Sequence, residues 1–285
     1  MAYGTGCNAR AQSDTMRALL ILVVAWTMAL GIDHAHAQDW QPLDPEQVLV
    51  IDSSQGRILV ELRPDMAPLA VTRIKKLSRE GVYNGLQFHR VIAGFVAQTG
   101  NPNNKDGGTS QYADLAPEFV FKLRLGPAAV LASRSSDATG GLLGSVPFEG
   151  TPLDPAKPSA DQTIRAWGAY CAGVAGMGRQ EDKGTANSEL FFMLAPARRL
   201  DRDYTVWGRV IVGFDVLQKL AIGEPPTKPD TIRQVRVLAD LPPAQRPRLA
   251  IASVSKLDSA IQKDRADKGA DFSVCDVGVP VQYQP

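Results

Sequence analysis

Short apolar runs separated by turn-forming residues make up most of the chain from residue 48 onward. The runs 48–51 and 57–62 flank the cluster Asp-Ser-Ser-Gln-Gly at 52–56, which predicts a β-hairpin. The same pattern predicts further strands at 86–100, 190–194, 204–212 and 235–237. The chain is therefore expected to be mostly β.

Two segments instead carry the periodicity of amphipathic helices. Apolar residues three and four positions apart surround Pro68 and end before Gly81, a residue that commonly terminates helices. A shorter helix is expected at 214–222, stopped by Gly223 and Pro225. Hairpins with two interspersed helices predict a mostly antiparallel barrel with helices over its open ends.

Two regions differ in composition from this pattern. The region 122–170 contains a Ser- and Gly-rich stretch at 133–150 and several prolines, and we interpret it as an insertion into a domain at 38–240. The Pro-rich run 242–247 is typical of a linker. It begins a C-terminal extension at 241–285, with an expected strand at 249–254 and helix at 257–268.

The first 37 residues have the three parts of an export signal. Arg10 and Arg17 precede an apolar run at 18–31, which is short for a membrane span. Ala35 and Ala37 occupy the positions that a signal peptidase reads. A secretory signal at 1–37 is therefore predicted, with a membrane anchor as the alternative and Met16 as a second candidate start. The mature chain would begin near Gln38, free of the membrane, in the periplasm or otherwise exported.

Charge and rare residues narrow the possible functions. The net charge of +1, without a concentrated basic stretch, removes the electrostatic argument for nucleic-acid binding. Beyond the signal only His89, Cys171 and Cys275 remain of their types, too few for a usual structural zinc site, so no metal is expected. Export favours a disulfide between the two cysteines, with two buried free thiols as the alternative.

Four sequence segments then point to a family. Residues 88–100 read FHRVIAGFVAQTG, followed by GMGR at 176–179, ANSELFF at 186–192 and LDRDYTVWGRV at 200–210. They resemble the FHR-x-x-x-x-F-x-x-Q-x-G signature of cyclophilins and three further segments of that family, in the same order. The resemblance spans about 48–238 and omits the tail. It implies a closed eight-stranded antiparallel barrel capped by two α-helices, and peptidyl-prolyl cis-trans isomerase activity.

The resemblance also implies residue roles. Arg90 would be the catalytic donor to the prolyl peptide bond. The proline pocket and the contacts to the substrate backbone and flanking residues would come from Phe95, Val96, Gln98, Gly178, Arg179, Glu189, Phe191, Arg199, Leu200 and Tyr204. His89 is expected to be a packed structural residue, because isomerisation moves no proton.

The physics of the reaction is consistent with this set. The barrier to peptide-bond rotation, about 18 to 20 kcal/mol, arises from the double-bond character of C–N, and no covalent bond changes. Catalysis therefore requires no cofactor, only an apolar pocket for the proline ring and a fixed donor. The planar, permanently charged guanidinium of Arg90 suits that role. Proline-containing polypeptides are the expected partners, and the oligomeric state stays open.

Four positions depart from the family pattern. Glu189 stands where many members have Gln, which predicts a negative charge in this subsite. Arg199 stands where the best-known eukaryotic members have a Trp linked to cyclosporin binding, so weak cyclosporin inhibition is expected. Tyr204 replaces a His, as in many bacterial members. Gly178 replaces Ala and is expected to loosen the peptide groove slightly.

The sequence leaves two alternative functions. In the first alternative the chain is a non-catalytic cyclophilin-like binding or scaffold module, whose insertion and tail carry the function. Retention of Arg90, Phe95, Gln98 and Phe191 argues against it, because a scaffold does not need the whole set. A serine hydrolase would depend on His89 as its base, and no nucleophile-elbow spacing accompanies that residue.

Overall fold

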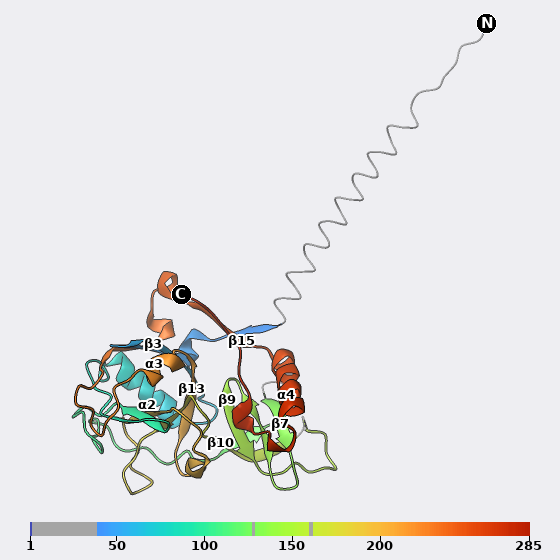
Figure 1. Ribbon diagram of the computed structural model, residues 1–285, viewed down its shortest axis with the longest axis horizontal. Helices are drawn as coiled ribbons and strands as arrows, with labels where there is room; N and C mark the ends of the chain where they lie inside the picture. The colour runs from blue at the N-terminus through green and yellow to red at the C-terminus, as the bar shows by residue number, and fades with distance from the viewer. Residues whose placement is uncertain (2–38, 127–128, 160–161) are drawn as a thin grey trace.

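A computed structural model describes Met1 and residues 39–126, 129–159 and 162–285, which form three β-sheets and the helices around them (Figure 1). The predicted signal and the predicted mature start at Gln38 lie outside the described residues, Met1 excepted. No helix in the described ranges combines the length and apolar character that a membrane span needs.

The largest sheet contains the strands that the sequence predicted. It begins with the hairpin of β2 (Val48–Ser53) and β3 (Gly56–Leu62). Its other strands are β4 (Arg90–Ile92), β5 (Val96–Thr99), β11 (Val174–Met177), β12 (Leu190–Met193), β13 (Val206–Val212) and β14 (Ile232–Val237). The strand order is β14-β2-β3-β13-β11-β12-β5-β4, and every neighbouring pair is antiparallel.

This sheet curls without closing, so the prediction of a closed barrel is wrong. Its two ends are β14 and β4, and near them the described residues form isolated bridges, Gln87 to Thr231 and Val91 to Gly223, in place of a ladder. The segment 224–229 before β14 contains three prolines. Proline has no N–H to donate to a strand ladder, so this segment cannot complete the barrel.

Two helices cover the curled sheet, as predicted. The buried face of α2 (Pro68–Arg79) consists of Ala70, Val71, Ile74, Leu77 and Ser78. Its apolar members join the core inside the curl, together with Phe88, Phe192 and Trp207. The helix α3 (Phe214–Gln218) is shorter than the predicted 214–222 and packs on β3.

The region interpreted as an insertion is an ordered second sheet. Its strands are β6 (Phe121–Arg124), β7 (Ala129–Arg134), β8 (Thr139–Leu143), β9 (Val146–Gly150) and β10 (Thr163–Gly168), in the order β6-β10-β9-β8-β7. Its apolar side chains, such as Leu142 and Phe148, share one core with Val96 and Phe191 of the large sheet. The second sheet therefore packs against the large sheet and helps to fix the positions of these side chains.

The C-terminal extension is folded onto both sheets. The predicted tail strand and helix correspond to β15 (Arg248–Ala252) and α4 (Val254–Lys268), and α4 lies beside β7 (Figure 1). The short strands β1 (Trp40–Pro42) and β16 (Val281–Gln284) flank β15 in a third sheet, which the sequence did not predict. The expected linker contains a single 3-10 turn, η5 (Pro243–Gln245).

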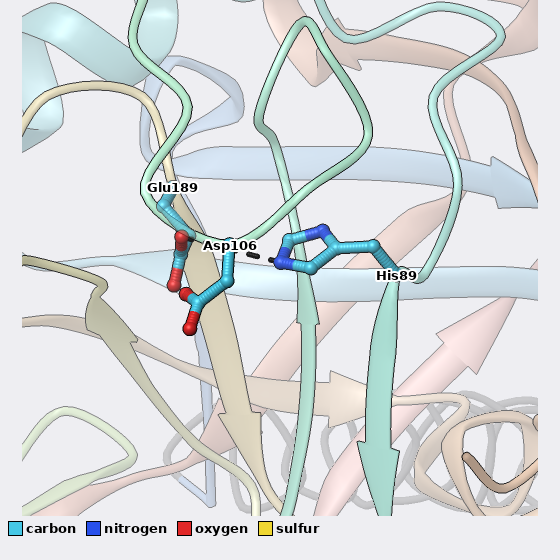
Figure 2. Close-up of side chains that lie close together, drawn as sticks. All are labelled: His89, Asp106 and Glu189. Atoms are coloured by element: carbon cyan, nitrogen blue, oxygen red, sulfur yellow. Dashed lines mark ion pairs between the residues drawn. The ribbon is translucent and has the colours of Figure 1, made fainter. Parts of the chain in front are cut away.

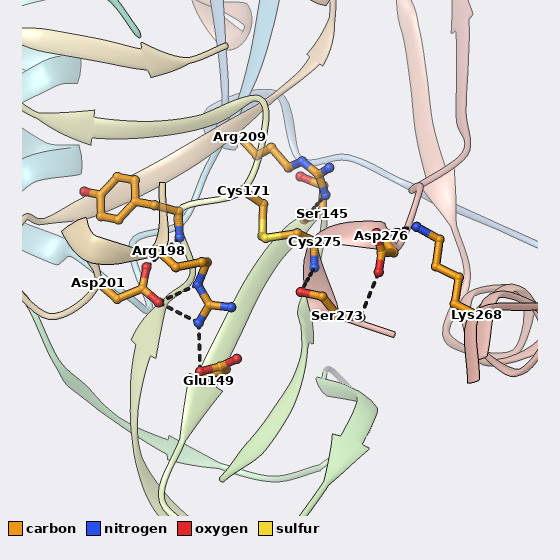
Figure 3. The surroundings of a disulfide bond; sticks show 11 residues. Ser145, Glu149, Cys171, Arg198, Asp201, Arg209, Lys268, Ser273, Cys275 and Asp276 are labelled. Atoms are coloured by element: carbon orange, nitrogen blue, oxygen red, sulfur yellow. Dashed lines mark hydrogen bonds and ion pairs between the residues drawn. A yellow bond between two sulfur atoms is a disulfide. The ribbon is translucent and has the colours of Figure 1, made fainter. Parts of the chain in front are cut away.

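The tail is also joined covalently to the rest of the fold. Cys171 and Cys275 form a disulfide with their Cα atoms 5.0 Å apart, the pairing expected from the sequence (Figure 3). Cys171 precedes β11 of the large sheet, and Cys275 lies in the 3-10 turn η7 (Val274–Asp276), which contacts β8 and β9. The disulfide therefore lies where the large sheet, the second sheet and the tail meet.

Candidate active site

Strand register places the main predicted site residues in one row across the sheet. Arg90 on β4 is opposite Gln98 on β5, Gln98 is opposite Phe191 on β12, and Phe191 is opposite Gly176 on β11. Directly opposite residues on antiparallel strands point to the same face. Their sequence neighbours, among them Val91, Ala97 and Phe192, point to the other face and fill the core inside the curl. The row therefore lies on the outer face of the curled sheet.

The outer face is hollowed where this row runs. A cleft of about 230 Å³ is lined by Arg90, Phe95, Val96, Gln98, Asp106, Gly178, Arg179, Glu189, Phe191, Leu200 and Tyr204. All predicted site residues except Arg199 therefore meet at one place, although they come from segments up to 114 positions apart, from Arg90 to Tyr204. Asp106 is the lining residue that the sequence analysis did not name.

An aromatic group forms the apolar wall of the cleft. The Phe191 ring stacks on Tyr170 at a centroid distance of 5.6 Å and meets the edge of Tyr204 at 5.7 Å. Gly176 makes room for that ring, because a Cβ at this position would lie 2.3 Å from Phe191 Cζ. The wall belongs to the core shared with the second sheet, so packing against that core fixes the position of the Phe191 ring.

The guanidinium of Arg90 is held at the rim by two partners. Its Nε donates to Glu224 Oε2 at 2.6 Å, and Nη1 donates to Gln98 Oε1. The Arg90 side chain is 28% exposed, so it is partly desolvated yet reachable from solvent. Nη2 has no hydrogen-bond partner in the described part of the chain and can donate to a bound substrate.

A buried carboxylate fixes the orientation of Gln98. Glu189 is 5% exposed, and its Oε1 accepts a hydrogen bond from Gln98 Nε2 at 2.6 Å, while Oε2 accepts one from Asn101 Nδ2. Because a carboxylate only accepts, Gln98 must turn its amide nitrogen toward Glu189 and its oxygen toward Arg90. Burial raises the pKa of Glu189, and the hydrogen bonds from Asn101 and Gln98 offset part of that rise.

The other groove residues lie between the aromatic wall and Glu189. Gly178 pairs with Glu189 through its backbone N–H, which donates to Glu189 O at 2.9 Å. Arg179 lies over the Tyr204 ring, 4.4 Å from its centroid, and its Nη2 donates to Asp203 Oδ2 at 2.8 Å. The Arg179 side chain is therefore bound to other residues of the protein, whereas its backbone can contact a peptide.

Arg199 and Gly178 differ from what the sequence predicted for them. Arg199 is exposed and does not line the cleft, but its guanidinium lies 4.7 Å from the Phe95 ring centroid, so it borders the pocket. The prediction that Gly178 loosens the groove is wrong. A Cβ at Gly178 would lie 2.2 Å from Glu189 Oε1 and 2.6 Å from its Cγ, so the Glu189 side chain already occupies that space.

His89 is buried beside the cleft, as expected for a packed residue. It is 3% exposed, and its Nε2 lies 4.0 Å from Glu189 Oε2 (Figure 2). Neither ring nitrogen has a hydrogen-bond partner among the residues that the structure describes. Burial lowers the pKa of His89, so the ring is neutral at neutral pH.

Three polar residues of the site were missed by sequence reasoning. Asp106 and Asn101 belong to the loop 101–108, which the sequence analysis did not assign to the site, and Glu224 follows the second helix. Each reaches the site through the fold rather than through a local motif. The Gly- and Asn-rich composition of 101–108 was a usable signal, because it directly follows the signature segment.

Comparisons with known proteins agree with this geometry. Residues 48–237 match the family profile described as cyclophilin type peptidyl-prolyl cis-trans isomerase. A probable peptidyl-prolyl cis-trans isomerase of Brucella suis is 35% identical over 224 residues, covering 77% of this chain and 95% of that protein. An isomerase of Schizosaccharomyces pombe is 28% identical over 173 residues, covering 60% and 83%.

A solved structure shares most of the fold, including part of the chain outside the family profile. The crystal structure of a cyclophilin from Hirschia baltica superposes with a TM-score of 0.77 at 31% sequence identity, covering 88% of this chain and 96% of that one. The chain therefore belongs to the cyclophilin-type peptidyl-prolyl cis-trans isomerases.

Proposed function

We propose that this chain isomerises X-Pro peptide bonds in polypeptides, with Arg90 as the catalytic residue. The observation that carries the proposal is the shared cleft. A guanidinium with an unoccupied donor and an aromatic wall are two strands apart in one row, on either side of Gln98. A proline ring against the wall would place its peptide bond near the guanidinium.

The reaction follows from what this arrangement can stabilise. The proline ring enters the slot formed by Phe95, Val96, Phe191 and Leu200. Rotation removes the amide conjugation and leaves the proline nitrogen pyramidal, with a localised lone pair. A donor already fixed in place by Glu224 and Gln98 binds this twisted amide better than the planar one, and such differential binding lowers the barrier.

The peptide backbone has its own contacts in this proposal. The extended main chain at Gly178 and Arg179 pairs with the substrate like an added short strand, while Gln98 bonds its backbone. The negative charge of Glu189 lies beneath this groove and favours basic or donor-rich residues next to the proline. No step requires proton transfer, which is why a neutral, buried His89 is compatible with activity.

The test is the Arg90→Ala variant in a prolyl isomerisation assay with a short peptide. Loss of one preorganised donor costs about 2.7 to 4 kcal/mol, so kcat/KM should fall about 100-fold to 1,000-fold. Arg124→Ala is the matched control, because Arg124 is exposed on β6 in the second sheet. Equal activity in the Arg90→Ala and wild-type proteins would reject the assignment.

The same variant separates the enzyme from the scaffold alternative. A non-catalytic module would bind proline peptides without accelerating their isomerisation, and Arg90→Ala would then change affinity alone. Isothermal titration with the assay peptide, run beside the rate measurement, distinguishes the two.

We further propose that the substrates are exported proteins and that the enzyme acts in the periplasm. The pattern of residues 1–37 and the disulfide both support an oxidising, extracytoplasmic location. Cell fractionation with N-terminal sequencing of the recovered protein tests this, and a cytoplasmic protein that retains residues 1–37 would contradict it.

A further inference from the structure

Three potential metal ligands from separate segments meet beside the cleft, two of them in its lining. His89 precedes β4, Asp106 lies in the loop 101–108, and Glu189 precedes β12 (Figure 2). One nitrogen or carboxylate oxygen from each lies within 4.8 Å of the corresponding atoms of the other two. We propose that these residues form a binding site for a divalent first-row transition-metal ion, with Zn²⁺ as the ion of reference.

The buried imidazole is the observation that separates this site from an ordinary acidic cluster. His89 is 3% exposed, yet neither of its nitrogens has a partner within the described ranges, and its Nε2 faces the Glu189 carboxylate at 4.0 Å. A buried polar group without a partner is energetically costly. A metal ion would satisfy the nitrogen and bind both carboxylates.

The distances suit a site that closes slightly on its ion. Ligand atoms about 2.1 Å from a tetrahedral Zn²⁺ are about 3.4 Å from one another, so the 4.0 Å between His89 Nε2 and Glu189 Oε2 must shorten. Asp106 is exposed on a loop and is the ligand with room to move. Glu189 is anchored by Gln98 and Asn101, the outer contacts that orient a ligating carboxylate.

The ligand types select the class of ion. One neutral imidazole and two carboxylates resemble the mixed nitrogen and oxygen sets that bind Zn²⁺ and its neighbours, whereas Ca²⁺ and Mg²⁺ prefer oxygen alone. Three protein ligands also leave a fourth position open to water or a substrate group. The site differs from a structural Cys-rich zinc site, for which the chain lacks ligands.

Binding of a metal ion would affect the catalytic residue Arg90. Glu189 orients Gln98, and Gln98 accepts from Arg90, so the ion would lie two side chains from the guanidinium. An ion here would also cancel negative charge beneath the groove. This consequence for peptide binding rests on the proposed function, whereas metal binding itself does not.

The experiment measures Zn²⁺ binding directly, without an activity readout. The full chain is purified without a polyhistidine tag, with His34→Asn and His36→Asn so that His89 is the sole histidine. After treatment with a chelator it is titrated with Zn²⁺ by calorimetry, and with Co²⁺ by visible absorption. One ion per chain is expected, together with a shift of the imidazole nitrogen resonance of His89.

Charge-removing variants locate the ion. Asp106→Asn and Glu189→Gln should each weaken Zn²⁺ binding about 10-fold or more. Asp106 is on the surface, so lost affinity in that variant, with an unchanged circular dichroism spectrum, does not reflect unfolding. Glu181→Gln removes an exposed charge nearby and should leave affinity unchanged.

Two results overturn the proposal. One is the absence of stoichiometric Zn²⁺ binding to the parent chain, which would mean that water satisfies the imidazole. The other is binding that weakens less than about threefold in both Asp106→Asn and Glu189→Gln, which would place the ion elsewhere.

Discussion

At the scale of single residues, Gly178 and Glu189 depend on each other. The carboxylate of Glu189 occupies the volume that a Cβ at position 178 would need, with contacts of 2.2 to 2.6 Å to three atoms of its side chain. Glu189 cannot easily retreat, because Gln98 and Asn101 hold both of its oxygens. The two departures from the family pattern, Gly178 and Glu189, are therefore linked, because the glycine leaves the space that the Glu189 side chain fills.

This dependence predicts non-additive stabilities. Gly178→Ala should destabilise the protein by about 1 to 3 kcal/mol through overpacking. The same change in a Glu189→Ala background should cost much less, because the clashing side chain is gone. Urea denaturation of the four members of this double-mutant cycle measures the coupling, and additive free energies of unfolding would refute it.

Arg199 predicts a pharmacological difference. Its charged head lies over Phe95 at the border of the pocket, where an apolar cyclic peptide such as cyclosporin would have to displace or desolvate it. Wild-type inhibition should be weak. Arg199→Trp should strengthen it about 10-fold or more, since an indole there adds apolar contact area.

Inhibition curves for the isomerase activity of the two proteins test this, with Arg199→Ala as the control for simple loss of charge. Nanomolar inhibition of the wild type would contradict the prediction.

At the scale of elements, alternation in the sequence was a reliable guide for the large sheet. The signature 88–100 contains β4 and β5, and its period of two places Arg90 and Gln98 on one face and Val91 and Ala97 on the other. A local pattern therefore determined both the strands and the row of site residues. Asp106 and Glu224 were not predicted because they lie in loops, and only folding brings those loops to the row of site residues.

The second sheet shows what composition alone does not predict. Gly140 and Gly141 belong to the Ser- and Gly-rich stretch 133–150 that marked the region 122–170 as an insertion, and both are in β8. A Cβ at Gly141 would lie 2.3 Å from Val130 O and 2.9 Å from Phe148 Cζ, so close packing requires the glycine. Nothing in a single sequence separates a glycine required by packing from one in a loop.

The disulfide predicts a measurable contribution to stability. It closes a loop of 104 residues, and in the chain-entropy picture a loop of about that size contributes about 4 to 5 kcal/mol through the unfolded state. The Cys171→Ala/Cys275→Ala protein should lose about 2 to 5 kcal/mol of unfolding free energy.

Denaturation of that variant, compared with the oxidised wild type, gives the value. A wild-type protein that reacts fully with an alkylating reagent before reduction would show instead that the cysteines are free.

At the scale of the whole molecule, charged side chains of the large sheet hold the turn between β8 and β9. Ser145 N donates to Glu61 Oε2 at 2.7 Å. Ser145 O accepts from Arg209 Nη1 at 2.9 Å (Figure 3). Burial lowers the pKa of Arg209 to about 10, although the charge of Glu61 opposes this. Glu61 is buried and Arg209 is half-buried, so losing a partner is costly for both groups.

Glu61 is therefore predicted to anchor the second sheet to the large one. It is 1% exposed and also accepts from Arg63 at 2.9 Å. Glu61→Leu should leave the buried Ser145 N–H without its acceptor and Arg63 with Asp65 as its remaining acidic partner, and destabilise the protein by about 3 to 5 kcal/mol. Asp65→Asn removes the exposed partner of the same arginine and should cost less than about 1 kcal/mol.

Chemical denaturation of both variants compares the two costs. Equal, small losses would show that this contact does not hold the sheets together.

The third sheet has a consequence for how the chain is made. Trp40 pairs with Ala252, so β1 emerges from a ribosome or a translocation channel long before its partner exists. Until β15 arrives, β1 is a short unpaired strand whose backbone groups are open to other chains. Such distant pairing forms slowly, because the intervening chain must first be brought together. The earliest described strand to be synthesised is thus one of the last to be secured.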